Sequence, residues 1–271
     1  MKKIIAVSLA VIIAASVAVV LFLVCNKEAE ICVMSYNLLA DNGEGGYDWG
    51  TPLEGRYEGA IKCLRKYAPD VAGLQETTNN WYAKIRENLP NYKFVNSVDP
   101  DNGNEDGICT ALMYNPDTVE LLESELIPFR SNYWGVGRVR YINMGYFRHR
   151  ETGIRFIAIS THFDAGQEED FAACRIDQAK QLAETLNGYI EKYSCPVISV
   201  GDYNCGVKSE PYNYVLSNTE MVSMNTKPKA ETIDHILCTN DVERVSFSII
   251  KSDYVKHASD HLPLRANIKI R

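Results

Sequence analysis

The sequence has few basic residues and none of the features of a disordered or repetitive chain. Of its 271 residues, 46% are hydrophobic and 23% are charged, a balance that excludes disordered, collagen-like and low-complexity proteins. There are 28 Lys and Arg against 35 Asp and Glu, which gives a formal net charge of −7. Since neutralising phosphates with side chains alone takes clustered Lys and Arg, any phosphate chemistry in this chain calls for a metal cation.

None of the eight cysteines forms a CxxC pair, which excludes a zinc ribbon. Most of them lie in apolar runs such as Ile31-Cys32-Val33, where cysteine behaves as a small hydrophobic residue.

No charged residue interrupts residues 4–24, and Lys2 and Lys3 precede this run. At ~1.5 Å per residue the run is long enough to cross a ~30 Å hydrocarbon core. It predicts an uncleaved membrane anchor within residues 1–30, with the rest of the chain outside the cytoplasm because the lysines stay inside. Two alternatives remain open: a lipoprotein modified at Cys25, and a secreted protein whose signal is cleaved.

Residues 31–271 contain no linker rich in Pro, Gly or Ser and no repeat, which predicts one domain after the anchor. Apolar, strand-like runs alternate there with helical patterns, as in α/β proteins. The predicted strands are 31–36, 71–74, 110–114, 156–160, 197–200, 233–237 and 264–270, and helices are predicted from residue 57 and over 171–193.

Chemically capable side chains recur at the ends of the predicted strands, where a rigid sheet holds functional loops. They are Asn37, Glu76, His162, Asp202 with Asn204, and Asp260-His261 before the last strand.

Asp234 is a charge between apolar residues at the start of its predicted strand, and a buried charge needs a partner. His261 is the candidate partner, because a carboxylate fixes the tautomer of an imidazole and raises its basicity. His235 alternates to the other face of the strand, which favours a structural role.

Six short motifs follow one another along the chain: Ser35-Tyr36-Asn37, Gly73-Leu74-Gln75-Glu76, Thr161-His162, Gly201-Asp202-Tyr203-Asn204, Ile233-Asp234-His235-Ile236 and Ser259-Asp260-His261. Their order and approximate spacing resemble the endonuclease/exonuclease/phosphatase superfamily over residues 31–271. The resemblance implies the fold of DNase I, a four-layer α/β/β/α sandwich. Smaller matches are Trp49, Arg56, Trp81, Arg140, Arg175 and Gln178.

The resemblance implies that a divalent ion, usually Mg²⁺ with Mn²⁺ or Ca²⁺ as alternatives, is held by Asn37, Glu76 and Asp260. The carboxylates of Glu76, Asp202, Asp234 and Asp260 would converge in one pocket. Converging carboxylates repel one another unless a cation lies among them, and Mg²⁺ prefers oxygen ligands.

The resemblance also implies the remaining roles in an in-line attack of water on phosphorus. Asp202, with His261 held by Asp234, would orient and deprotonate the water. Asn204 and His162 would donate to the phosphoryl oxygens, and Arg140 would hold a phosphate oxygen.

We therefore expect a metal-dependent phosphodiesterase that acts on a nucleic-acid or phospholipid/sugar phosphodiester outside the cytoplasm. The expected partners are this phosphate-ester substrate and a membrane contacted through residues 4–24, with no stable protein partner. A phosphomonoesterase for sugar or lipid phosphates and an inactive binding module on the same fold remain as alternatives.

Overall fold

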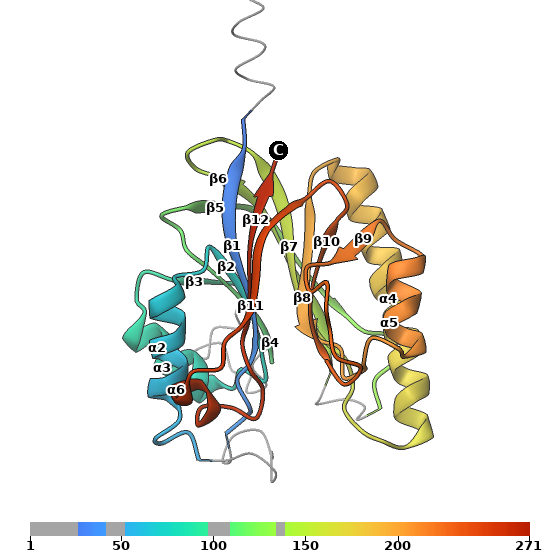
Figure 1. Cartoon of the computed structure of the whole chain (residues 1–271), viewed down its shortest axis with the longest axis horizontal. Helices are drawn as coiled ribbons and strands as arrows, with labels where there is room; N and C mark the ends of the chain where they lie inside the picture. The colour runs from blue at the N-terminus through green and yellow to red at the C-terminus, as the bar shows by residue number, and fades with distance from the viewer. Residues whose placement is uncertain (1–26, 42–51, 97–108, 134–138) are drawn as a thin grey trace, which may run out of the picture.

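The computed structural model describes residues 27–41, 52–96, 109–133 and 139–271, in which two six-stranded sheets face each other (Figure 1). The first sheet has the order β11-β12-β1-β2-β4-β3. Its strands, in chain order, are β1 (Ala29–Asn37), β2 (Val71–Gln75), β3 (Lys93–Val95), β4 (Thr110–Tyr114), β11 (Glu243–Ile249) and β12 (Leu264–Ile270).

The second sheet has the order β5-β6-β7-β8-β10-β9. Its strands are β5 (Val119–Pro128), β6 (Tyr141–His149), β7 (Arg155–His162), β8 (Val197–Asp202), β9 (Met221–Ser223) and β10 (Asp234–Thr239). In each sheet one central pair, β1 with β2 or β7 with β8, is parallel. The carboxyl-terminal ends of the two strands in each parallel pair therefore lie next to each other, at the same end of the sheet.

Helices cover the outer face of each sheet (Figure 1). The helices α2 (Tyr57–Tyr67), α3 (Asn79–Asn88) and α6 (Asp253–Lys256) lie on the first sheet, and α4 (Glu169–Tyr193) and α5 (Glu210–Ser217) lie on the second. The predicted α/β/β/α layers are confirmed.

Three buried apolar clusters hold these layers together. One lies between the sheets and includes Val33, Val200 and Ile268, and the other two lie between each sheet and its helices. The sheets approach each other closely where Gly73 faces β8, since a Cβ on Gly73 would lie 2.3 Å from Val200 Cγ2. This close approach brings the strand ends of the two sheets within reach of each other.

Local sequence explains where the helices begin. Thr78 caps α3 by accepting a hydrogen bond from Trp81 N, and Ser209 caps α5 in the same way from Tyr212 N. Such side-chain caps satisfy amide groups that have no partner within the helix.

The strands and helices predicted from apolar runs are all present, within two residues at most ends. The sequence pattern did not reveal β3, β5, β6, β9, β11, α3, α5 or α6. Most of these are short, or they lie at a sheet edge and face solvent along much of their length, as β11 does.

The predicted anchor at residues 4–24 and the alternative lipidation site Cys25 lie outside the described residues. Among the helices that the structure describes, none has the length and apolar character needed to span a bilayer. The seven cysteines in the described ranges are free thiols.

His235 has the structural role that its position on β10 predicts. Its ring is buried against Tyr203 and Tyr212, and its Nε2 lies 3.2 Å from the carbonyl oxygen of Cys205. Burial lowers the pKa of His235 to about 4, even though the Cys205 carbonyl favours the charged form. The ring is therefore neutral in the folded protein at neutral pH.

This burial predicts an acid-sensitive contribution to stability. As pH falls below the usual histidine value of 6.5, the unfolded chain gains a proton that folded His235 does not, so the free energy of unfolding decreases. The loss attributable to this ring is about 2 kcal/mol between pH 7 and pH 5.

Urea denaturation at pH 7 and at pH 5 measures this decrease in the free energy of unfolding. His235→Gln should lose that part of the pH dependence, whereas His257→Gln, at an exposed ring, should keep all of it. An unchanged pH dependence in His235→Gln would contradict the prediction.

Candidate active site

Three of the predicted site residues lie side by side at one end of the second sheet. On β7 and β8, His162 pairs with Asp202, and on β8 and β10, Asp202 pairs with Asp234. Residues directly opposite each other on neighbouring strands point to the same face of a sheet. The register of these strands therefore places the three side chains in one row.

Asn37 joins this row to the first sheet. It is the last residue of β1, and its side chain is completely buried. Its Nδ2 donates to Asp202 Oδ2 and to Glu76 Oε1, both at 3.0 Å, and its Oδ1 accepts from Leu39 N. A single amide group therefore connects the acidic residues of the two sheets.

Glu76 follows β2, and both of its carboxylate oxygens accept hydrogen bonds. Its Oε1 accepts from Asn37, and its Oε2 accepts from Ala40 N at 2.9 Å. The segment that carries Ala40 is fixed in turn by Trp81, whose indole donates to Leu39 O, and by Arg56, which donates to Leu38 O, Leu39 O and Ala40 O. Arg56 and Trp81 thus support the carboxylate of Glu76 indirectly.

Backbone strain accompanies these strand ends. Leu39, Glu76 and Asn204 have φ values of 58°, 58° and 47°, in the left-handed region that non-glycine residues seldom adopt. Such conformations cost about 1–3 kcal/mol each and cluster at functional sites.

The loop that carries Asp260 and His261 is attached to the end of β1 by Ser259. The Ser259 hydroxyl donates to Asn37 O at 2.7 Å and accepts from His261 N at 3.1 Å. Arg56 also donates to Ala258 O in this loop. These contacts place the last motif beside the first, although they are more than two hundred residues apart in the chain.

The predicted pair of His261 and Asp234 is present. His261 Nδ1 lies 2.8 Å from Asp234 Oδ2, and its Nε2 lies 3.7 Å from Asp202 Oδ2. Burial lowers the pKa of His261, but the hydrogen bond to Asp234 and the charges of Asp234, Asp202 and Asp260 outweigh it and raise the pKa to about 10. In this arrangement the imidazole of His261 carries a proton at neutral pH.

Asp202 is nearly inaccessible to solvent. Burial and the neighbouring charge of Asp234 raise its pKa to about 7, while His261, Asn204 and Asn37 oppose the shift. Its Oδ1 accepts from Asn204 N at 2.8 Å. The predicted phosphate donor Asn204 also donates through Nδ2 to Phe163 O, so its side-chain amide is oriented by the loop after β7.

Arg140 and His162 lie together on the other side of Asp202. Arg140 Nη1 is 2.6 Å from His162 Nδ1, and His162 Nε2 is 3.6 Å from Asp202 Oδ2. Burial, Arg140 and His261 hold the pKa of His162 well below its usual value. His162 is therefore a neutral ring.

Several buried polar atoms around this row have no hydrogen-bond partner. They are Arg140 Nε, His162 Nε2, Asp164 Oδ1 and Asp234 Oδ1. Arg140 Nε and Asp164 Oδ1 face each other at 3.6 Å as an ion pair. Because buried polar groups normally have partners, His162 Nε2 and Asp234 Oδ1 are left as the unmet donor and acceptor expected of a binding site for a polar ligand.

The donor set fits a divalent cation. Potential ligand atoms of Asp202, Asp234 and His261 lie within 4.8 Å of one another, and Glu76 is joined to Asp202 through Asn37. Since His261 is bonded to Asp234 through Nδ1, the carboxylates are the potential ligands in this group. A cation would offset the repulsion that raises the pKa of Asp202. Of the predicted ligands Asn37, Glu76 and Asp260, the first is buried, the second is partly buried and Asp260 is exposed.

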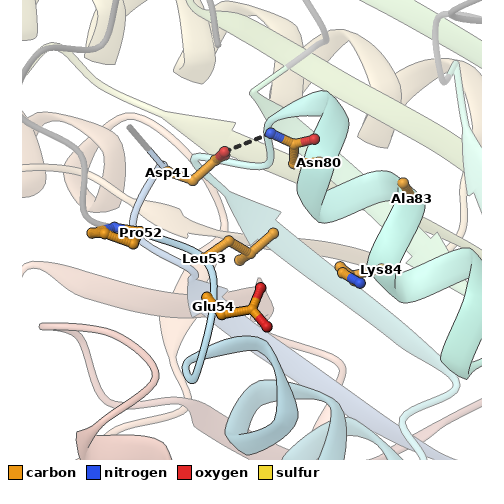
Figure 2. A pocket seen from close by; sticks show the side chains of 7 residues that line it. All are labelled: Asp41, Pro52, Leu53, Glu54, Asn80, Ala83 and Lys84. Carbon is orange, nitrogen blue, oxygen red and sulfur yellow. Dashed lines mark hydrogen bonds between the residues drawn. The ribbon is translucent and has the colours of Figure 1, made fainter. Parts of the chain in front are cut away.

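A hollow of about 370 Å³ opens beside the segment that holds Glu76. Figure 2 shows it between the N-terminal part of α3 and the stretch that leads into α2, with Asn80 bonded to Asp41. Both oxygens of Asp41 have partners, Thr78 Oγ1 and Asn80 Nδ2. The hollow is lined by Asp41, Pro52, Leu53, Glu54, Asn80, Ala83 and Lys84.

The structure therefore assembles nearly all the predicted site residues at one edge of the two sheets. The assigned roles of these residues remain predictions. Sequence reasoning missed two residues: Ser259, which it quoted only as part of a motif, and Asp164, which follows His162 by two positions. The smaller matches Arg175 and Gln178 support the Asp164 loop; Trp49 lies outside the described residues.

With this geometry in place, comparisons with known proteins show which proteins the chain resembles. The model of the Endonuclease/Exonuclease/phosphatase family matches residues 34–261. Tyrosyl-DNA phosphodiesterase 2 of Rattus norvegicus is 28% identical over 155 residues, which are 57% of this chain and 38% of that protein. The matched part thus spans well under half of that relative.

Two solved structures share the fold. An endonuclease/exonuclease/phosphatase from Bacteroides vulgatus has a TM-score of 0.74 and 24% identity, covering 90% of this chain and 100% of that one. A mannosyl-6-phosphatase from Bacteroides thetaiotaomicron VPI-5482 has a TM-score of 0.72 and 20% identity, covering 88% and 99%. Both likenesses concern the DNase I-like arrangement of sheets and helices.

The bridging role of Asn37 gives a prediction on stability. Asn37→Leu keeps the branching of the side chain but removes the donor to Asp202 and Glu76. Leaving buried acceptors without a donor costs about 1–3 kcal/mol, so the free energy of unfolding in metal-free buffer should fall by that amount.

Urea denaturation measures this change. Asn187→Leu is the matched control, because the amide of Asn187 makes an exposed bond to Asn218 O, and it should change stability much less. If Asn37→Leu is as stable as the unmodified protein, Asn37 does not link the two sheets energetically.

Proposed function

This chain belongs to the endonuclease/exonuclease/phosphatase family, and from that premise we propose that it is a metal-dependent phosphodiesterase. The observation that carries the proposal is the surroundings of Asp202 Oδ2. This buried oxygen accepts from Asn37 at 3.0 Å and is faced by His162 Nε2 at 3.6 Å and His261 Nε2 at 3.7 Å. A carboxylate between two imidazoles can hold a water molecule and take its proton.

Asp202 is the proposed base of this site. Its pKa of about 7 suits a group that accepts a proton near neutral pH, because a general base works best close to its own pKa. His261, with a pKa of about 10, instead orients the water and stabilises negative charge while it is protonated. Asp234 fixes the ring of His261 through Nδ1.

The opposite side of the site would bind the phosphoryl group. His162 Nε2 is a buried donor that lacks a hydrogen-bond partner, and a donor fixed in advance stabilises the charge that develops on phosphoryl oxygens. Arg140 lies behind this ring, with its Nη1 at His162 Nδ1 and its Nε facing Asp164. Asn204 lies next to the carboxylate of Asp202.

Asn37, Glu76 and Asp260 are the proposed ligands of a divalent ion, most simply Mg²⁺. The oxygens of Glu76 and Asp260 suit a hard cation that keeps several waters. When bound, such an ion polarises a phosphoryl oxygen and neutralises developing charge.

The choice of a diester rests on the sequence relative, whose name is that of a phosphodiesterase. A monoesterase for sugar or lipid phosphates is the second candidate, since a structural neighbour is named as a mannosyl-6-phosphatase. An inactive binding module is disfavoured because Glu76, Asp202 and His261 are all present.

Hydrolysis of bis-p-nitrophenyl phosphate tests the proposal. The protein should turn it over with Mg²⁺ and lose this activity in EDTA. Asp202→Asn should lower kcat by about 10²- to 10⁴-fold, the range for loss of general-base catalysis. Asp253→Asn, at an exposed carboxylate paired with Lys256, should leave kcat unchanged.

The outcomes separate the candidates. Hydrolysis of p-nitrophenyl phosphate alone would overturn the phosphodiesterase in favour of the monoesterase. Binding of Mg²⁺ without turnover of either ester would point to the binding module.

We further propose that residues 4–24 anchor the enzyme in a membrane with residues 31–271 outside the cytoplasm, on the basis of the sequence pattern alone. A protease added to intact cells should then cleave a tag fused after Arg271. A tag that is protected until the cells are lysed would contradict this location.

A further inference from the structure

We propose that Asp164, through Arg140, is the positioning residue that keeps the imidazole proton of His162 on Nε2, the nitrogen that faces Asp202. This inference deepens the proposed function and rests on it for its catalytic meaning. It concerns a carboxylate to which neither the motifs nor the comparisons give a role.

Asp164 is a fully buried carboxylate on the loop that follows β7. Its Oδ2 accepts from Tyr133 N at 2.8 Å and from Gln178 Nε2 at 3.1 Å. Its backbone is also fixed, since Asp164 N donates to Gln178 Oε1 and Arg175 donates to Asp164 O. Helix α4 thus holds this side chain in one orientation.

The other oxygen, Asp164 Oδ1, faces Arg140. It lies 3.6 Å from Arg140 Nε, and both atoms lack a hydrogen-bond partner. The Arg140 side chain is only 13% exposed and that of Asp164 is 0% exposed. Since an isolated charge at such depth is costly, the carboxylate provides the countercharge that keeps the guanidinium in this place.

The position of Arg140 decides the tautomer of His162. Arginine has five N–H donors and no acceptor, and its Nη1 lies 2.6 Å from His162 Nδ1. His162 Nδ1 must therefore accept. In a neutral imidazole the other nitrogen then carries the proton, so His162 Nε2 is a donor.

His162 Nε2 has no partner and lies 3.6 Å from Asp202 Oδ2. With its proton fixed there, the ring presents a donor to an oxygen of the substrate beside Asp202. The opposite tautomer would present a lone pair to that oxygen and would repel it. Asp164 therefore acts on the reaction without touching the substrate.

Asp164→Asn tests this chain of contacts. The single oxygen of the amide would be occupied by Tyr133 N and Gln178, so its NH₂ would face the N–H groups of Arg140. We expect the guanidinium to move away from His162 and the Nε2–H tautomer to lose its preference.

Two-dimensional ¹H–¹⁵N NMR of histidine-labelled protein reports the tautomer directly, with the His162 signals assigned from a His162→Gln variant. The unmodified protein should show Nε2–H at His162, and Asp164→Asn should show a mixture of tautomers. Glu184→Gln, which removes an exposed partner of Arg130, is the matched control and should leave the His162 signals unchanged.

A kinetic measurement adds an independent readout. Asp164→Asn should lower kcat at least tenfold, and adding it to His162→Gln should lower kcat no further, because the two changes affect the same donor. An additive loss in the double variant would overturn the proposal. So would an Nδ1–H tautomer in the unmodified protein or an unchanged tautomer in Asp164→Asn.

If Asp164→Asn does not fold by circular dichroism, Arg140→Leu, which leaves no donor from position 140 at His162 Nδ1, decides. Loss of the Nε2–H preference supports the proposal and its retention overturns it. The NMR result needs no turnover, so a protein that hydrolyses no phosphate ester would refute the proposed function and leave the tautomer assignment standing.

Discussion

The hydrogen bond from Asn37 to Asp202, 3.0 Å long, is the contact on which the site depends. It joins the ends of β1 and β8, which belong to different sheets, at a carboxylate that is almost fully buried. A buried charge is tolerated only where donors and opposite charges surround it. The strand registers, the close approach of the sheets at Gly73 and the loop fixed by Ser259 all bring such groups to Asp202.

The fold was predictable wherever burial leaves a clear pattern in the chain. Central strands such as β2 and β8 are buried at every position and read as short apolar runs that end in polar residues. The edge strand β11 is mostly exposed, and α3 has few apolar residues. β11 is held by pairing with β12, and α3 by contacts such as that of Trp81 with Leu39, which the local periodicity of each segment does not record.

The sequence predicted the site residues that belong to the recognised motifs, but it did not predict the residues that support them. The pair of His261 and Asp234 followed from a single charge in an apolar strand. The roles of Ser259 and Asp164 depend on contacts with Asn37, 222 residues away, and with Tyr133, 31 residues away. No spacing rule in the sequence signals these contacts, because the three-dimensional path of the chain creates them.

The central claim is that the strand ends of the two sheets form a single metal-binding hydrolytic centre around Asp202. Crystals of the protein soaked with Mn²⁺ test it most directly, through an anomalous difference map. We expect a strong peak among the oxygens of Asn37, Glu76 and Asp260, beside Asp202. A peak confined to another part of the surface, with these side chains left without metal, would contradict it.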